Sequence, residues 1–163
     1  MAIKRKNRGI VSWLLIVGLT LLVGFSPTLF GITEAGDWYN ALPKPPRTPQ
    51  PGVFPVAWTV LFILIGWGAW FVHRPVTRSI RHRREALELY GAHLFVNAAW
   101  PITFFGFKAV GLALGILIVL MILVIFLLIR FWYIRPIAGL CLIPYLAWLC
   151  FAFYLNAGVW LAL

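Results

Sequence analysis

AVGLALGILIVLMILVIFLLI, residues 109–129, is an almost wholly aliphatic run that contains no charged residue. A helix needs about 20 apolar residues to cross the hydrocarbon core of a bilayer. Further long runs that are poor in charge precede and follow it along the chain. We therefore predict an all-α integral membrane protein, a single domain over residues 1–163 that forms a bundle of five transmembrane helices at about residues 9–32, 52–72, 85–107, 109–129 and 136–161.

The composition agrees with lipid as the main solvent of this chain. Of the 163 residues, 63% are hydrophobic and 11% are charged, whereas soluble domains average about 45–50% apolar and about 25% charged residues. A soluble globule of this size has too little interior to hide so much apolar surface. These values exclude a soluble domain, a disordered chain and a disulfide-rich scaffold. The two cysteines, Cys141 and Cys150, would lie about 13 Å apart on one helix, beyond the reach of a disulfide.

The basic residues predict the orientation of the bundle. They outnumber the acidic residues by 14 to 4, and membrane proteins gather them in cytoplasmic connections. Because most lie in the N-terminus and in the second and fourth connections, we predict a cytoplasmic N-terminus. Their position between apolar runs argues against a nucleic-acid partner, and we interpret the basic second loop as a solvated or lipid-headgroup face, with a partner-protein contact as the alternative. The first side holds Lys4, Arg5, Lys6, Arg8, Arg74, Arg78, Arg81, Arg83, Arg84, Arg130 and Arg135, and the other holds Lys44, Arg47 and Lys108.

The first connection has a composition of its own. Residues 33–51 contain five prolines, which fix φ and lack an N–H group. We therefore predict a stiff segment that forms a lid over one end of the bundle. Its candidate ligand-contacting residues are Trp38, Lys44, Pro45 and Arg47.

Aromatic and polar residues mark the inward faces of three of the predicted helices. Lipid tails solvate Leu, Ile and Val well, so residues of other kinds that repeat at helical spacing point towards protein. We interpret these stripes as the walls of a pocket for a flat apolar ligand, with simple packing as the alternative. The stripes comprise Trp58 and Phe62; His93, Asn97, Trp100 and Phe104; and Tyr145, Trp148, Ala152 and Leu155, with Asn156 beside the last of them.

Polar and small residues in these helices need specific neighbours. An unpaired Asn97 would cost roughly several kcal/mol in hydrocarbon, so it must bond another helix, water or a ligand, and we favour an interhelical bond. His93 has no second His or Cys at ligand spacing, so we expect no metal site, with haem or metal ligation as the alternative. Gly111 and Gly115 form a GxxxG pair, which serves packing within the bundle or a dimer.

No familiar catalytic constellation occurs in the sequence. It lacks a Gly-rich phosphate loop and a Ser-His-Asp set. Only four residues are acidic, and none lies near the middle of a predicted helix. The lack of intramembrane carboxylates also argues against a proton-coupled pump.

Three ordered motifs carry a resemblance to a known family. The first is WYNALPKPP, residues 38–46, followed by Pro49 and Trp58; the second is NAAWP, residues 97–101, followed by Phe104; and the third is PYLAW, residues 144–148, followed by Phe151, Ala152 and Asn156. They resemble the translocator proteins and tryptophan-rich sensory proteins, the TspO/MBR family, which includes the peripheral-type benzodiazepine receptors. Arg47 departs from the family pattern, in which Trp is usual. The chain ends at Leu163 without the sterol motif that follows the fifth helix in animal members, which favours a bacterial member.

The resemblance implies a five-helix bundle, often a homodimer, that binds porphyrins and other tetrapyrroles, sterols and benzodiazepine-type drugs. Its pocket would lie beneath the first loop. The bacterial cell membrane is the expected location, with the outer membrane as the alternative. The expected partners are membrane lipid, porphyrin- or sterol-like small molecules and a second copy of the chain. The implied pocket walls are Trp58, Asn97, Trp100, Trp148, Ala152 and Leu155.

The function expected from these features is that of a membrane receptor or carrier for planar hydrophobic ligands. No cofactor is required, and a porphyrin or haem-type molecule would be a ligand. Two alternatives stay open. One is an enzyme that degrades porphyrins photo-oxidatively, with Trp58 and Trp148 as candidate catalytic residues. The other is a tetrapyrrole transporter.

Overall fold

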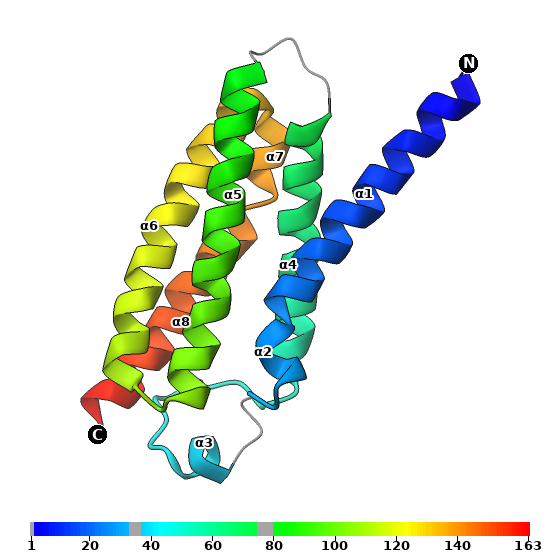
Figure 1. Ribbon diagram of the computed structural model, residues 1–163. Coiled ribbons are helices and arrows are strands. Elements are labelled where there is room, and N and C mark those ends of the chain that lie inside the picture. Colours follow the sequence, from blue (N-terminus) through cyan, green and yellow to red (C-terminus); the bar gives the residue numbers. More distant parts are fainter. Residues whose placement is uncertain (1, 33–36, 75–79) are drawn as a thin grey trace.

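The part of the chain that the structure describes consists of helices and connecting turns, with no strand in it (Figure 1). This computed structural model describes residues 2–32, 37–74 and 80–163. Residues 33–36 of the predicted lid and Arg78 of the basic second loop lie outside the described residues. The elements are α1 (Ala2–Gly24), α2 (Ser26–Leu29), α3 (Asp37–Ala41), α4 (Val53–His73), α5 (Ile80–Pro101), η1 (Ile102–Gly106), α6 (Val110–Ile134), α7 (Pro136–Leu140) and α8 (Ile143–Leu161).

The long helices α1, α4, α5, α6 and α8 run in alternating directions, so successive connections fall at opposite ends of the molecule (Figure 1). Helix α1 packs along α4, and its N-terminal end leans away from the other helices. The all-helical class predicted from the sequence is confirmed for the described residues.

One-sided burial of apolar helices builds the core. Helix α6 buries a stripe whose members are spaced by three or four residues, whereas Ile118, Ile122 and Phe126 on its other side are exposed. A helix that is apolar all round and buried on one side has lipid as the solvent of its outer face. The buried stripe comprises Ala113, Leu117, Leu120, Val124, Leu127 and Phe131.

Among the described residues, three helical stretches are long and apolar enough to cross a membrane: α4, α6 and the stretch Pro136–Leu161, which contains α7 and α8. In α1 the apolar part is the shorter segment Gly9–Gly24. Helix α5 begins with charged turns, in which Arg81 pairs with Glu85 at 2.8 Å and Arg84 pairs with Glu88 at 2.7 Å. These charges lie at the end of the bundle that holds the N-terminus of α1 (Figure 1).

Prolines divide two of the helices that the sequence predicts as continuous. The segment predicted as 9–32 is helical to Gly24, and the short helix α2 follows with Pro27 in its first turn. The segment predicted as 136–161 consists of α7 and α8, and Pro144 lies in the first turn of α8. Proline is tolerated in a first turn, where its missing N–H is not needed, and it ends a preceding helix because of that lack.

The other predicted helices match observed elements with shifted ends. The segment predicted as 85–107 is α5, which starts earlier at Ile80, and its final part is the π-helix η1 after Pro101. The segments predicted as 52–72 and 109–129 correspond to α4 and α6, and α6 extends to Ile134.

Glycines permit close contacts between the helices. A Cβ on Gly66 would lie 2.9 Å from Cα of Val17, so α1 and α4 approach each other closely there. A Cβ on Gly111 would lie 2.8 Å from Nε1 of Trp160, so this half of the GxxxG pair packs within the chain. Apart from its own turn of helix, no atom of the described residues lies within 4 Å of the Cβ position of Gly115.

The segment between α2 and α4, which we call the proline-rich loop and which is described for residues 37–51, lies across the end of the bundle where α8 ends (Figure 1). The hydroxyl of Tyr154 on α8 donates a hydrogen bond to the carbonyl oxygen of Pro46 at 2.9 Å. A Cβ on Gly158 would lie 2.7 Å from Cβ of Pro45, so the loop rests directly on the helix. Residues Pro45 to Thr48 form a turn closed by a Thr48 N to Pro45 O bond of 3.4 Å, with Arg47 at φ 67°.

Candidate ligand-binding site

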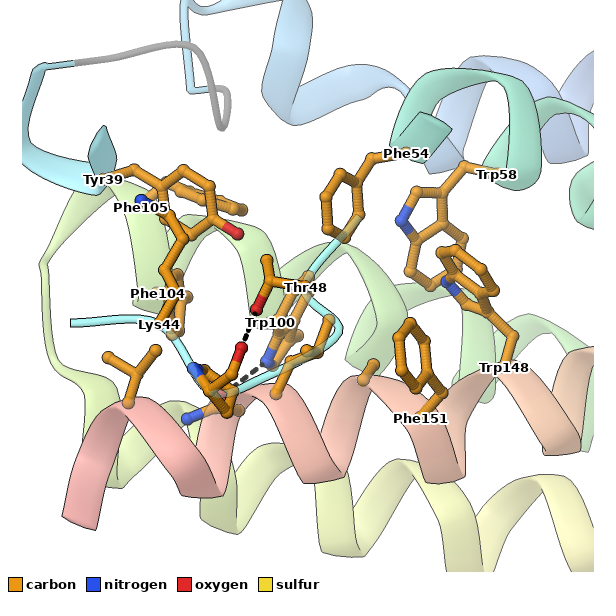
Figure 2. A pocket seen from close by; sticks show the side chains of 15 residues that line it. Tyr39, Lys44, Thr48, Phe54, Trp58, Trp100, Phe104, Phe105, Trp148 and Phe151 are labelled. Carbon is orange, nitrogen blue, oxygen red and sulfur yellow. Dashed lines mark hydrogen bonds between the residues drawn. The ribbon is translucent and has the colours of Figure 1, made fainter. Parts of the chain in front are cut away.

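A covered cavity lies between α4, α5, η1, α8 and the proline-rich loop (Figure 2). Its volume is about 50 Å³. Figure 2 shows Tyr39, Phe104 and Phe105 at one end, and Phe54, Trp58, Trp148 and Phe151 at the other, with Trp100 and Thr48 between them. We call it the first cavity, and its lining residues are Tyr39, Lys44, Pro45, Thr48, Phe54, Trp58, Trp100, Phe104, Phe105, Trp148, Phe151, Ala152, Leu155, Asn156 and Val159.

Three indole rings from three helices form much of its wall. Trp58 of α4 and Trp148 of α8 meet edge to face with ring centroids 6.4 Å apart. Trp58 also stacks on Phe62 at 5.3 Å, and Trp100 of α5 stacks on Phe104 at 5.6 Å. Such ring pairs favour planar aromatic partners, because a flat ligand can make the same stacked and edge contacts.

Two asparagine side chains near the first cavity are hydrogen-bonded to groups on neighbouring helices. The indole nitrogen of Trp100 donates to Oδ1 of Asn156 at 3.1 Å, and Nδ2 of Asn156 donates to the carbonyl oxygen of Val110 at 3.0 Å. The hydroxyl of Tyr145 donates to Oδ1 of Asn97 at 3.2 Å. Asn97 therefore makes an interhelical bond, from α5 to α8.

The loop contributes a positive charge. Lys44 lines the first cavity, and its Nζ donates to the carbonyl oxygen of Asn40 at 3.1 Å and lies 4.7 Å from the ring centroid of Tyr39. A carboxylate on a bound ligand would find a cation at this end of the cavity.

A second cavity of about 290 Å³ lies between the α1–α2 segment, α4 and α5. It shares Trp58, Trp100 and Phe105 with the first cavity. None of the described residues that line it is charged. Its lining residues are Gly24, Phe25, Pro27, Thr28, Ile32, Pro55, Trp58, Phe62, Asn97, Trp100, Pro101 and Phe105.

An open apolar groove lies on the outside of α4 and α8. Its volume is about 540 Å³, and Trp148 and Phe151 border both this groove and the first cavity. These two rings therefore separate the cavity from the outer surface of the bundle. The other lining residues are Val56, Ala57, Val60, Leu61, Leu64, Pro144 and Ala147.

The structure brings together most of the site residues predicted from the sequence. Phe62 and Asn97 line the second cavity, Trp58 and Trp100 line both cavities, and Trp38 and Arg47 of the loop line neither of them. Trp38 instead packs edge to face on Phe104 with centroids 5.7 Å apart. The predicted residues that line the first cavity are Lys44, Pro45, Trp58, Trp100, Phe104, Trp148, Ala152 and Leu155.

His93 and Tyr145 line neither cavity and are fully buried. Nδ1 of His93 and the carbonyl oxygen of Tyr90 are 2.6 Å apart, and Nε2 has no hydrogen-bond partner among the described residues. The ring of His93 meets the ring of Tyr145 edge to face at 5.9 Å. No group of three or more His, Cys, Asp or Glu side chains within residues 2–32, 37–74 and 80–163 is placed to hold a metal ion.

Several lining residues were not among those predicted. Phe54 precedes Trp58 by four positions, Phe151 follows Trp148 by three, and Val159 follows Leu155 by four. Helical spacing therefore places these three residues on the same faces as the predicted wall residues. Asn156 lies beside the predicted stripe on α8 and is not one of the predicted walls, although it lines the first cavity. Phe105 falls in the π-helix, and Tyr39 and Thr48 come from the loop, where no periodicity applies.

Comparisons with known proteins agree with the motifs. The profile of the TspO/MBR family matches residues 16–161. The chain is 32% identical over 150 residues to a tryptophan-rich protein TspO of Chlorobaculum tepidum, covering 92% of this chain and 94% of that protein. It is 32% identical over 151 residues to a translocator protein of Bos taurus, covering 91% and 89%. It is 31% identical over 146 residues to a tryptophan-rich sensory protein of Cereibacter sphaeroides, covering 90% and 89%.

Proposed function

This integral multi-pass membrane protein belongs to the TspO/MBR family, and we propose that it is a receptor or carrier for planar hydrophobic ligands, with porphyrins and other tetrapyrroles as the best-fitting class. Sterol- and benzodiazepine-type molecules are further members of the ligand class. The family resemblance observed in the sequence is confirmed by the match over residues 16–161.

One observation carries the proposal: three indole rings from α4, α5 and α8 border one covered, mostly apolar cavity. Ligand sites of this kind combine apolar and aromatic walls with a few polar groups that fix orientation. Here the polar groups include Lys44 and Asn156 in the first cavity and Asn97 in the adjoining second cavity. A tetrapyrrole has a flat ring for the indoles and carboxylates for the lysine.

The topology that we propose has five membrane spans, with the N-terminus in the cytoplasm and the proline-rich loop on the opposite side of a bacterial cell membrane. The alternating directions of α1, α4, α5, α6 and α8 support it (Figure 1). The basic residues Arg74, Arg81 and Arg130 support it as well, since they follow α4, begin α5 and end α6 at the same end of the bundle. We further propose that two copies form a homodimer, as the family resemblance implies.

The test is a titration of the detergent-solubilised protein with protoporphyrin IX, followed by porphyrin absorbance. The double variant Trp58→Ala, Trp148→Ala removes two walls, and its affinity is expected to fall about tenfold or more. The matched control is Trp67→Ala, Trp132→Ala, which removes two indoles that are exposed on the outside of α4 and α6. Unchanged affinity in the first double variant would exclude this cavity as the binding site.

The contact between Trp58 and Trp148 favours one second candidate, photo-oxidative breakdown of a bound porphyrin. Tryptophan can donate an electron to an excited porphyrin, and both indoles border the cavity at a mutual distance of 6.4 Å. Molecular oxygen would be the final oxidant. Illumination of the complex in air separates the two functions, because an unaltered porphyrin spectrum would leave binding as the activity.

A further inference from the structure

We propose that the Trp58 indole is a movable partition between two chambers of one site, and that a large planar ligand binds by displacing it. The chambers are the first and second cavities, which share Trp58, Trp100 and Phe105 as walls. The inference rests on the proposed function, because it concerns how the same site admits its ligand.

The sizes of the chambers support such a movement. Pockets for drug-sized ligands have volumes of about 300–1,000 Å³, whereas the first chamber has about 50 Å³. The second chamber, at about 290 Å³, reaches only the lower end of that range. A tetrapyrrole therefore needs space from both chambers, and the shared side chains lie between them.

Trp100 is the fixed part of this shared wall. Its indole nitrogen donates to Oδ1 of Asn156 at 3.1 Å, and Asn156 is itself held by the carbonyl oxygen of Val110 at 3.0 Å. Asn156 is buried, so swinging Trp100 away would leave a buried acceptor without its donor. The hydrogen bond opposes any movement of this ring.

Trp58 is the shared indole that no hydrogen bond of this kind holds in place among the described residues. No hydrogen bond from its indole nitrogen occurs among the residues described, and the ring is held by packing against the apolar core and by aromatic contacts. These contacts are with Phe62 at 5.3 Å, Tyr145 at 6.3 Å and Trp148 at 6.4 Å. An aromatic ligand can replace such contacts with equivalent ones, so displacement of Trp58 leaves no buried polar group unpaired.

The two chambers differ in charge, which specifies the ligand further. Lys44 lines the first chamber, whereas the residues that the structure shows around the second are uncharged, with Asn97 and Thr28 as its polar members. The matching ligand is amphipathic, with its acidic end in the first chamber and an uncharged ring edge in the second. A single-ring acid would fill only the first chamber.

Two plug variants test the use of each chamber. Thr28→Trp adds bulk at the second chamber from α2, and Ala152→Phe adds bulk in the first chamber from α8. Leu29→Trp is the matched control, because the neighbouring Leu29 is 75% exposed and lines neither chamber. Affinity for protoporphyrin IX is expected to fall about tenfold or more in both plug variants and to stay unchanged in the control.

The outcomes separate this inference from the proposed function. Loss of affinity in Ala152→Phe alone would overturn the two-chamber site and leave the proposed function standing. Absence of porphyrin binding by the wild-type protein would remove the proposed function itself, whereas equal binding by every variant would exclude both chambers as the site and overturn this inference. Circular dichroism checks the fold of each variant, and Leu155→Phe replaces Ala152→Phe if the latter does not fold.

A rate measurement tests the movement of Trp58 directly. If displacement of the indole limits ligand entry, the smaller ring in Trp58→Phe raises the association rate severalfold in stopped-flow mixing with protoporphyrin IX. Trp67→Phe on the outer side of the same helix is the control and keeps the wild-type rate. An association rate that Trp58→Phe leaves unchanged would overturn the role of Trp58 as a partition.

Discussion

Trp100 and Asn156 join two helices that lie far apart in the sequence, because the indole nitrogen of Trp100 on α5 donates a hydrogen bond to Oδ1 of Asn156 on α8. Asn156 also donates from Nδ2 to the carbonyl oxygen of Val110, where α6 begins. One carboxamide thus links three helices at the edge of the first cavity. Stability and ligand binding are therefore expected to depend on the same side chain.

Replacing Asn156 with Leu is expected to lower the free energy of unfolding by about 1–3 kcal/mol, since the indole N–H and the Val110 carbonyl lose their partner. Trp100→Phe removes the donor from the other side. Because both substitutions break the same bond, the double variant is expected to lose less than the sum of the two single losses. Unfolding in micelles, followed by circular dichroism, measures all three variants, and strictly additive losses would contradict the link.

The contact between Gly158 and Pro45 predicts how the loop responds to one methyl group. In Gly158→Ala the new Cβ would lie 2.7 Å from Cβ of Pro45, so the loop must move away from α8. We expect ligand affinity to fall by about 2- to 10-fold, because Pro45 and Lys44 both line the first cavity. The titration with protoporphyrin IX measures it.

Gly115→Ala is the control for this substitution, since it also places a methyl group on a helical glycine. No other part of the described chain lies within 4 Å of the Cβ position of Gly115, and Ala is favoured over Gly in a helix interior. We expect unchanged affinity and equal or slightly higher thermal stability. Equal effects of the two alanines on affinity would show that the loop contact is unimportant for binding.

The burial of His93 predicts that iron adds nothing to ligand affinity through this residue. His93 lines neither cavity, and its ring lies fully buried against Tyr90 and Tyr145. The affinity for ferric haem divided by the affinity for metal-free protoporphyrin IX is therefore expected to be the same, within about twofold, in the wild type and in His93→Leu. A haem absorption band that shifts on binding in the wild type and not in His93→Leu would identify His93 as an axial ligand and refute the expectation.

The sequence indicates which face of a helix each site residue lies on. It is less informative about where along the helix axis the cavities lie. Helical spacing places His93 and Asn97 on one face of α5, and both are buried. Spacing of this kind does not say how far along the bundle the hollow extends, and His93 lies one turn before Asn97, towards the start of α5. Tyr145 likewise lies about one turn before Trp148 on α8. His93 and Tyr145 therefore pack in the core beside the cavities and do not line them.

The apolar runs predicted the all-helical class well, because a long uncharged segment has few other structures available in lipid. Helix ends were less predictable. Hydropathy continues through Phe25 and Pro27, and only the backbone chemistry of proline explains why α1 ends at Gly24. The loop residues Tyr39 and Thr48 could not be assigned to the cavity from spacing, because their positions depend on contacts of the loop with α8 and η1.

The packing of Gly111 against Trp160 has a consequence for self-association. A pair of glycines one turn apart lets a neighbouring helix cross at short range only when both faces are vacant. Here the indole of Trp160 already packs on Gly111, so of the two glycines only Gly115 is left uncovered by the described residues. A symmetric crossing of two α6 helices would have to centre on that single position, so a glycine-based seam is the less favourable way to pair two copies.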